Sequence, residues 1–178
     1  MATARAATLF RQLDAFELGV CLRANRACRL HPIERFFGAV SRLGDGSLWY
    51  GLIMLLPVTF GADALEASVR MAVTGAVGVL GYKFLKSRMV RQRPFVSHAD
   101  IRSATRPIDR YSFPSGHTLH AVAFTTIASA YFPILAWVLV PFTVLVAASR
   151  IVLGLHYPSD VLVGAAIGGL LAYLGLQF

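Results

Sequence analysis

Three separated clusters of polar residues interrupt an otherwise apolar sequence of 178 residues. The first contains Lys86 and Arg93, the second is the tetrapeptide 114–117 (Pro-Ser-Gly-His), and the third covers residues 149–160. Cationic side chains bind anionic oxygens, and histidine can donate or accept a proton near neutral pH. Together the clusters predict a site that binds an anionic group and transforms it.

The second cluster predicts the start of a helix that faces the polar side of a membrane. Pro114 ends the preceding loop, and Ser115 is a typical N-cap residue. The free N–H groups of a first helical turn, at the positive end of the helix dipole, form an anion site. His117 places a group that titrates near neutrality beside that site. A capped helix start without chemistry would explain this cluster equally well on its own.

The first and third clusters could supply the remaining groups. Lys86 and Arg93 are seven residues apart, so a helix that ends at Pro94 would place both on one face. A basic membrane edge would explain that pair alone. In the third cluster His156 precedes Asp160 by four residues, and the carboxylate could reach back to orient the imidazole, as in a catalytic triad.

The composition is that of a membrane protein. Hydrophobic residues make up 56% of the chain and charged residues 15%, whereas a soluble domain carries about 25% charged residues. The net charge of +8 suits a lipid headgroup or a phosphate substrate, and in so apolar a chain we expect no nucleic-acid partner. Cys21 and Cys28 fit neither a metal site nor a disulfide framework, so we expect two packing residues.

The apolar segments predict an all-α, integral-membrane helical bundle of about five to six helices, in a single domain over residues 1–178. An amphipathic helix over residues 6–29 would precede it, and the pattern does not decide whether this helix lies in the membrane interface or packs on the bundle. The other predicted helices are 33–43, 48–62, 67–85, 118–132, 134–153 and 161–178.

Counting membrane crossings predicts where the polar clusters meet. If each of the last four apolar segments crosses once, the loops 86–114 and 150–160 lie on the same membrane face. Arg150 lies there within an apolar run, and ionisable residues in such positions are functional candidates. We therefore expect one active site within residues 86–160, at one end of the bundle.

The three clusters together resemble the signature of the type 2 phosphatidic acid phosphatase superfamily, which also includes vanadium haloperoxidases and glucose-6-phosphatase. That signature is Lys-x6-Arg-Pro, then Pro-Ser-Gly-His, then Ser-Arg-x5-His-x3-Asp, and the sequence matches it without a departure between Lys86 and Asp160. The resemblance covers the chain from Lys86 to its C-terminus. It implies a metal-independent lipid phosphatase of the bacterial integral-membrane branch, with no cofactor.

The resemblance also implies a role for each residue. His156 would attack phosphorus to form a phosphohistidine, and Asp160 would orient its ring. His117 would protonate the leaving oxygen and then deprotonate the hydrolytic water. Three cations would do the work of a metal ion, so no metal is expected. The groups that would bind the phosphoryl oxygens are the side chains of Lys86, Arg93, Arg150 and Ser115 and the N–H of Gly116.

The remaining histidines and arginines have simpler interpretations. His120 is one turn after His117 and is expected to be a hydrogen-bonded bundle residue, whereas His31 and His98 fall in predicted loops. Five further arginines could attract an anionic headgroup, or could equally form a solvated basic face. They are Arg88, Arg91, Arg102, Arg106 and Arg110.

Several functions stay open on the sequence alone. Undecaprenyl diphosphate is slightly favoured as substrate, and phosphatidate or phosphatidylglycerophosphate is the alternative. Vanadate-dependent haloperoxidase chemistry and a non-catalytic lipid-binding scaffold are further alternatives. The bacterial inner membrane is the expected location, with the active site on the periplasmic face. The many basic residues near the site would instead predict the cytoplasmic face. The sequence does not decide the oligomeric state.

Overall fold

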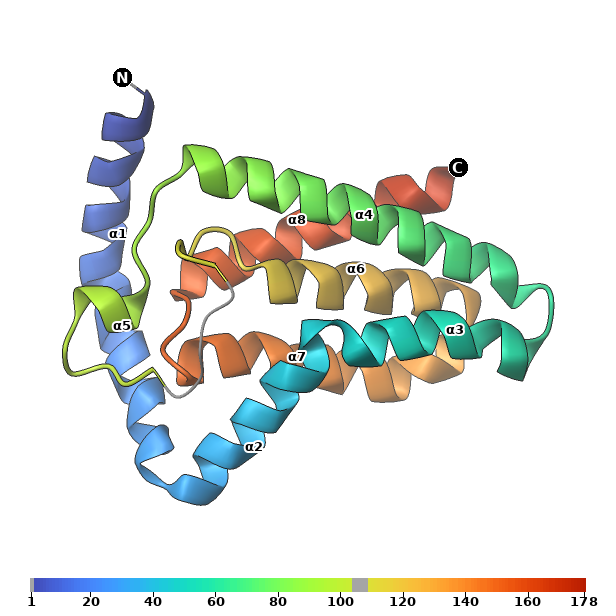
Figure 1. Ribbon diagram of the computed structural model, residues 1–178, viewed down its shortest axis with the longest axis horizontal. Helices are drawn as coiled ribbons and strands as arrows, with labels where there is room; N and C mark the ends of the chain where they lie inside the picture. Colours follow the sequence, from blue (N-terminus) through green and yellow to red (C-terminus); the bar gives the residue numbers. More distant parts are fainter. Residues whose placement is uncertain (1, 104–108) are drawn as a thin grey trace.

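The computed structural model describes residues 2–103 and 109–178, with side chains in the first helix from Asp14 onward. Figure 1 shows a bundle of roughly parallel helices with one helix crossing its end. No strand occurs in these described ranges, which confirms the predicted all-α fold. In chain order the elements are α1 (Ala2–Asn25), η1 (Arg26–Arg29), α2 (His31–Arg42), η2 (Leu43–Ser47), α3 (Leu48–Phe60), α4 (Ala64–Arg88), α5 (Pro94–Ser97), α6 (Gly116–Tyr131), η3 (Pro133–Leu135), α7 (Ala136–Val152) and α8 (Pro158–Gln177).

The bundle consists of α3, α4, α6, α7 and α8, which correspond to the five long apolar segments of the sequence. Helix α6 is central, because it packs against α4, α7 and α8. Its buried face is apolar and includes Leu119, Phe124 and Ile127. Within a bilayer, close van der Waals packing of such side chains, and not their transfer out of lipid, holds the helices together.

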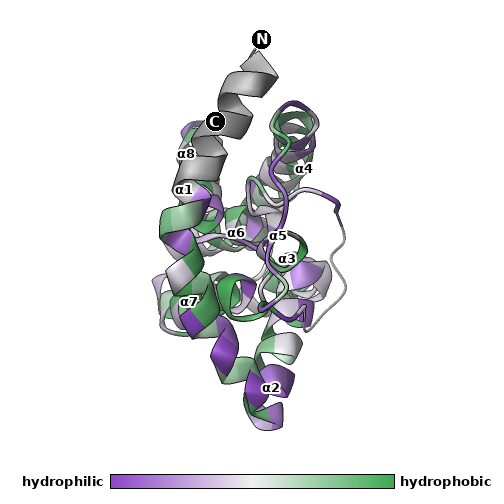
Figure 2. Cartoon of the chain, turned by 90° about the vertical axis from the view of Figure 1, so that its left-hand side faces the viewer, coloured by the Kyte–Doolittle hydropathy of each residue, from purple (hydrophilic) through white to green (hydrophobic). Residues whose placement is uncertain are grey.

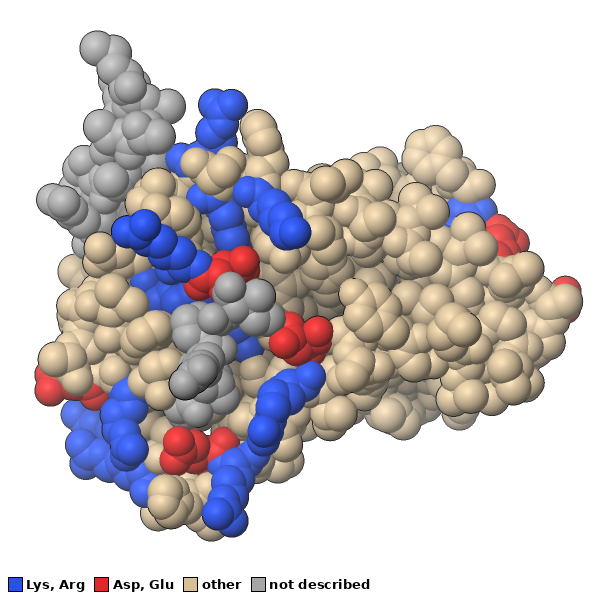
Figure 3. Space-filling model, viewed as in Figure 1, with Lys and Arg blue, Asp and Glu red and all other residues tan. Residues whose placement is uncertain are grey.

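The outer surface of the bundle suits a membrane. Four helical stretches are long and apolar enough to cross one: His31–Phe60, Ala64–Arg88, Pro133–Val152 and Pro158–Gln177. Large apolar side chains face outward; Val58, for example, is 79% exposed. Figure 3 shows the middle of the molecule almost free of charge, with most charged residues at one end and a few at the other. Such a surface is stable in hydrocarbon, and the protein is an integral membrane protein.

Helix α1 lies across the charged end of the bundle (Figures 1 and 2). Its packed face carries Glu17, Cys21 and Asn25, which are buried, whereas the apolar side chains of Phe16 and Val20 are exposed. The helix therefore packs on the bundle with a polar and small-residue face, in agreement with the second of the two predicted alternatives. Neither cysteine forms a disulfide, and both are buried, as predicted.

Candidate active site

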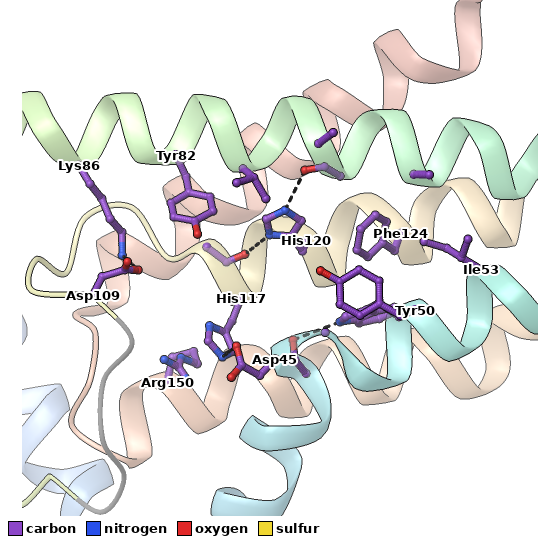
Figure 4. A pocket seen from close by; sticks show the side chains of 18 of the residues that line it. Asp45, Tyr50, Ile53, Tyr82, Lys86, Asp109, His117, His120, Phe124 and Arg150 are labelled. Carbon is purple, nitrogen blue, oxygen red and sulfur yellow. Dashed lines mark hydrogen bonds and ion pairs between the residues drawn. The ribbon is translucent and has the colours of Figure 1, made fainter.

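A cavity of about 480 Å³ lies at the end of the bundle where α4 and α7 end and α6 and α8 begin (Figure 4). Its volume is within the usual range for small-molecule sites. The loops 86–114 and 150–160 both contribute to it. Six of the eight predicted site residues line the cavity: Lys86, Arg93, Gly116, His117, Arg150 and His156.

A close contact between α6 and α8 places the second and third clusters side by side. A Cβ atom added to Gly164 would lie 2.5 Å from the Ser115 carbonyl oxygen. One added to Gly168 would overlap the Leu119 carbonyl oxygen, so only glycine permits this approach. The Ser115 N–H donates to the Asp160 carbonyl oxygen at 3.0 Å. The start of α6 is therefore held against the start of α8.

Ser115 caps α6, as the sequence predicts. Its hydroxyl oxygen accepts a hydrogen bond from the Thr118 N–H at 3.5 Å and lies 2.9 Å from the Thr118 hydroxyl. The Ser115 side chain is fully buried and is not part of the cavity lining, whereas the neighbouring Gly116 is. His117, two residues after the cap, also lines the cavity.

His156 has a carboxylate on one side of its ring and an arginine on the other. Its Nδ1 atom lies 3.6 Å from Asp160 Oδ2, and its Nε2 atom lies 3.2 Å from Arg93 Nη1. Burial, reinforced by the charges of Arg150 and Arg93, lowers the pKa of His156 well below its usual range. The imidazole is therefore neutral near pH 7, which is the nucleophilic form.

Arg93 does not lie on the same helix as Lys86, contrary to the prediction. Helix α4 ends earlier, and Arg93 is extended, with φ −77° and ψ 151°. The reason is local, because Pro94 disfavours helical backbone at the residue before it. Arg93 still reaches the cavity: its Nη1 atom donates to the Leu155 carbonyl oxygen at 2.8 Å, and its Nε atom to that of Asp109 at 3.0 Å.

Lys86 and Arg150 complete the cationic wall of the cavity. Lys86 Nζ donates to Asp109 Oδ2 at 2.7 Å and to the Tyr111 carbonyl oxygen at 3.2 Å. Arg150 is 3% exposed and donates from Nη1 to the Ser41 hydroxyl. Its Nε atom has no hydrogen-bond partner within the described residues. A buried donor left unpaired is costly, and Arg150 is one of the residues that line the cavity.

His117 contacts a carboxylate from outside the three sequence clusters. Its Nε2 atom lies 3.2 Å from Asp45 Oδ1 (Figure 4). Asp45 belongs to η2, the bend between α2 and α3, and lines the same cavity. The site therefore contains two histidine–carboxylate pairs, one on each catalytic candidate.

His120 is a bundle residue, as expected. Its Nδ1 atom lies 2.8 Å from the Gly116 carbonyl oxygen, and its Nε2 atom lies 3.2 Å from that of Gly75. Across the described part of the chain, no three side chains of histidine, cysteine, aspartate or glutamate converge as a metal site.

Arg91 is buried, so its assignment to a solvated basic face is wrong. It is 1% exposed, and three carboxylates surround its guanidinium group. Its Nη1 atom donates to Asp160 Oδ1 at 2.5 Å, and its Nη2 atom to Glu17 Oε2 at 2.6 Å. The Asp14 carboxylate accepts from its Nε atom at 2.8 Å. Arg91 therefore links α1 to the carboxylate behind His156.

The other arginines at this end are mostly exposed. Arg88, Arg102 and Arg110 face the surface, in agreement with a basic face, and Arg106 lies outside the described residues. Figure 3 shows several lysine and arginine side chains on the visible face of the active-site end. They create a positive field that can attract an anionic substrate.

Away from the cations the cavity is apolar. It continues between α3, α4 and α6, where aliphatic and aromatic side chains replace the charged ones. A cavity with a cationic end and an apolar remainder fits a ligand with an anionic head and an apolar chain. The apolar lining includes Trp49, Ile53, Met54, Ala72, Ala76, Val79 and Phe124.

Comparison with known proteins shows one consistent family. The chain matches the model of the PAP2 superfamily over residues 64–178. It is 32% identical over 130 residues to the undecaprenyl-diphosphatase BcrC of Bacillus subtilis, and the aligned region covers 72% of this chain and 67% of that protein. It is 36% identical over 134 residues to the decaprenylphosphoryl-5-phosphoribose phosphatase of Mycobacterium tuberculosis, and the aligned region covers 72% of this chain and 71% of that protein.

The fold is also similar to that of a solved structure. The crystal structure of a transmembrane PAP2-type phosphatidylglycerolphosphate phosphatase from Bacillus subtilis has a TM-score of 0.80 with this chain at 24% sequence identity. The superposition covers 97% of this chain and 89% of the crystallised one. At this identity the similarity establishes the arrangement of the helices and no more.

Proposed function

The chain belongs to the PAP2 superfamily, and from this premise we propose that it is a metal-independent membrane lipid phosphatase acting through a phosphohistidine. The observation that carries this proposal is the convergence of a carboxylate-backed imidazole, His156, with three cations at the polar end of an otherwise apolar cavity. A nucleophile oriented by a carboxylate and a preorganised set of cations are the two requirements of phosphoryl transfer without a metal.

The reaction has two steps. In the first, His156 Nε2 forms a bond to phosphorus while the bond from phosphorus to the lipid oxygen breaks, and His117 gives a proton to that oxygen. In the second, His117 takes a proton from water, and the water oxygen displaces Nε2 from phosphorus. Inorganic phosphate leaves, and both histidines return to their starting protonation states.

The cations hold the phosphoryl oxygens in both steps. Lys86, Arg93 and Arg150 approach the cavity from a helix end, an extended loop and the last turn of another helix. Three directions suit the three non-bridging oxygens of a phosphoryl group, whose negative charge must be stabilised in the transition state. The Gly116 N–H, in the first turn of α6, adds an uncharged donor.

We favour undecaprenyl diphosphate as substrate, with phosphatidylglycerophosphate or phosphatidate as the alternative. Of the sequence relatives described above, one is named an undecaprenyl-diphosphatase, and the other is named for a phosphoribose substrate that carries a decaprenylphosphoryl group. The apolar part of the cavity supports a lipid substrate of either class, because it would receive the part of the chain next to the phosphate.

Phosphate release by the purified protein in detergent tests the proposal. Undecaprenyl diphosphate, phosphatidylglycerophosphate and phosphatidate are compared with and without a chelator. We expect turnover that the chelator does not change, fastest on undecaprenyl diphosphate. Loss of turnover with chelator would contradict a metal-independent mechanism. Release from none of the three lipids would favour the lipid-binding scaffold, and activity that requires vanadate would favour the haloperoxidase alternative.

Filling the apolar part of the cavity should weaken lipid binding selectively. We expect Ala76→Trp to raise KM for a long-chain lipid phosphate by about tenfold, because the indole would occupy the space between α3 and α4. KM for a short water-soluble aryl phosphate should not change. Val77→Trp is the matched control, because Val77 is exposed on the same helix and does not line the cavity. An equal KM change for both substrates would show that Ala76 does not contact the lipid chain.

We further propose that the active-site end faces the periplasm. The basic residues near the site would favour the cytoplasm by the positive-inside rule. Lys86, Arg91 and Arg93 are buried and engaged with partners in the site, so they are poor indicators of orientation. This weakens the one argument for a cytoplasmic active site.

Labelling in intact bacterial cells tests the orientation. Ala99→Cys places an exposed thiol at the active-site end, and Ala62→Cys places one at the opposite end, between α3 and α4. A membrane-impermeant maleimide should label the first variant and not the second. Labelling of Ala62→Cys alone would place the active site in the cytoplasm. The native cysteines are buried and provide a low background.

A further inference from the structure

Asp45 is a charged residue in an unexpected place. It lies within the His31–Phe60 stretch, which is apolar enough to cross a membrane, and it lies before the region that matches the family model, residues 64–178. Its side chain is 44% exposed, and it lines the cavity. A carboxylate inside a membrane-spanning segment is costly unless a function retains it.

The backbone at Asp45 and Gly46 departs from helical geometry. Asp45 has φ −84° and ψ 17°, and Gly46 has φ 122°, so the helix is interrupted for two residues. A left-handed φ of this size favours glycine. The bend is held from both sides: Trp49 Nε1 donates to the Gly44 carbonyl oxygen at 3.2 Å, and Gly44 packs closely against Val146 of α7. The backbone next to Asp45 is therefore held in place by packing.

The target of Asp45 is the His117 ring. Asp45 Oδ1 lies 3.2 Å from His117 Nε2, and Figure 4 shows the carboxylate beside the imidazole. Burial of the His117 ring disfavours a protonated imidazole, and the nearby cations Arg150 and Lys86 act in the same direction. A carboxylate in contact with the ring has the opposite effect and also restricts its rotation.

We propose that Asp45 is the positioning residue of the proton donor: it orients His117 and stabilises its protonated form, as Asp160 does for His156. This inference rests on the proposed role of His117 as the general acid. In the reactive form of the enzyme His117 carries the proton, which passes to the leaving oxygen, and Asp45 neither gains nor loses a proton. One carboxylate, Asp160, then serves the histidine that attacks phosphorus, and the other, Asp45, serves the histidine that protonates the leaving oxygen.

The test separates leaving groups. The purified enzyme is assayed with phosphatidate, a phosphomonoester whose alkoxide needs a proton to leave, and with nitrophenyl phosphate, whose phenoxide does not. We expect Asp45→Asn to lower kcat by about tenfold or more on the lipid and by less than about threefold on the nitrophenyl ester. Asp45→Glu should restore part of the loss. Asp63→Asn is the control, because Asp63 is exposed at the opposite end of the bundle.

Two further variants show through which residue Asp45 acts. His117→Ala should show a larger loss on the lipid than on the nitrophenyl ester, and Asp45→Asn combined with His117→Ala should lose no more than His117→Ala alone. Equal losses on both substrates in Asp45→Asn, or losses that multiply in the double variant, would overturn the inference while leaving the proposed function intact. If His117→Ala itself fails to separate the two substrates, the proposed acid role is wrong, and this inference fails with it.

Discussion

We expect His156→Ala to lower kcat by about 10⁴-fold or more while leaving the helical bundle folded. His156 lines the cavity, and its Nε2 atom lies next to Arg93. An alanine at this position offers no nucleophilic atom in its place. The ring is buried and neutral, so its removal deletes no ion pair on which the fold depends. Asp160 keeps its bonds to Arg91 and to the Tyr157 N–H.

A covalent intermediate gives a second readout for this prediction. A substrate with a labelled terminal phosphate should transfer label to the wild-type protein in a form stable to alkali and lost in acid, as expected for phosphorus on an imidazole nitrogen. His156→Ala should acquire no label. His31→Ala is the control, because the His31 side chain is exposed at the start of α2 and does not line the cavity. Label on the His156→Ala protein would mean that another residue is the nucleophile.

The cations that line the cavity could be predicted from the sequence, because the spacing of the motifs and the order of the membrane crossings specify which residues meet. Motif spacing identified Lys86, Arg93, Arg150 and the two histidines, and counting crossings placed them at one end of the bundle. The apolar runs that predict helices are a local property, so the helices followed from the sequence with small differences at their ends. The error at Arg93 was also local, because the helix was extended to Pro94 when it ends earlier.

The supporting carboxylates were missed because their partners are distant in sequence. Glu17 and Asp45 reach Arg91 and His117 only after α1 and η2 have packed on the bundle. No periodicity records such a contact. One signal was nevertheless present: acidic residues are scarce, nine in the whole chain, and an acidic residue within or beside an apolar helix requires a partner. Pairing each one with a candidate cation or histidine would have pointed to both.

The second large effect is expected at Arg91, which holds Asp160 from behind. Arg91→Ala leaves the carboxylates of Asp14, Glu17 and Asp160 close together without their shared cation. Removing one partner of a buried ion pair costs about 3–5 kcal/mol of unfolding free energy. We therefore expect a clear decrease in Tm in detergent. We also expect kcat to fall by about 10- to 100-fold, the usual cost of losing an outer partner that orients a reactive group.

The loss of stability and the loss of activity can be separated. Arg91→Met combined with Asp14→Asn and Glu17→Gln removes the two α1 charges that would otherwise be uncompensated, and should recover much of the Tm. Activity should stay low, because Asp160 still lacks the donor that meets its Oδ1 atom at 2.5 Å. Arg88→Ala, at the exposed end of α4, is the control for general loss of positive charge.

Arg91→Lys then tests whether the geometry of the guanidinium group matters. One ammonium group carries the same charge, but it lacks the planar fork that lets Arg91 donate to Asp14, Glu17, Ser159 and Asp160 at once. We expect a Tm close to that of the wild type and a kcat between those of the wild type and Arg91→Ala. If the triple variant regains activity together with Tm, Arg91 only supports the packing of α1. If activity stays low while Tm recovers, the first helix of the chain reaches the nucleophile through Arg91 and Asp160, and the active site begins with α1.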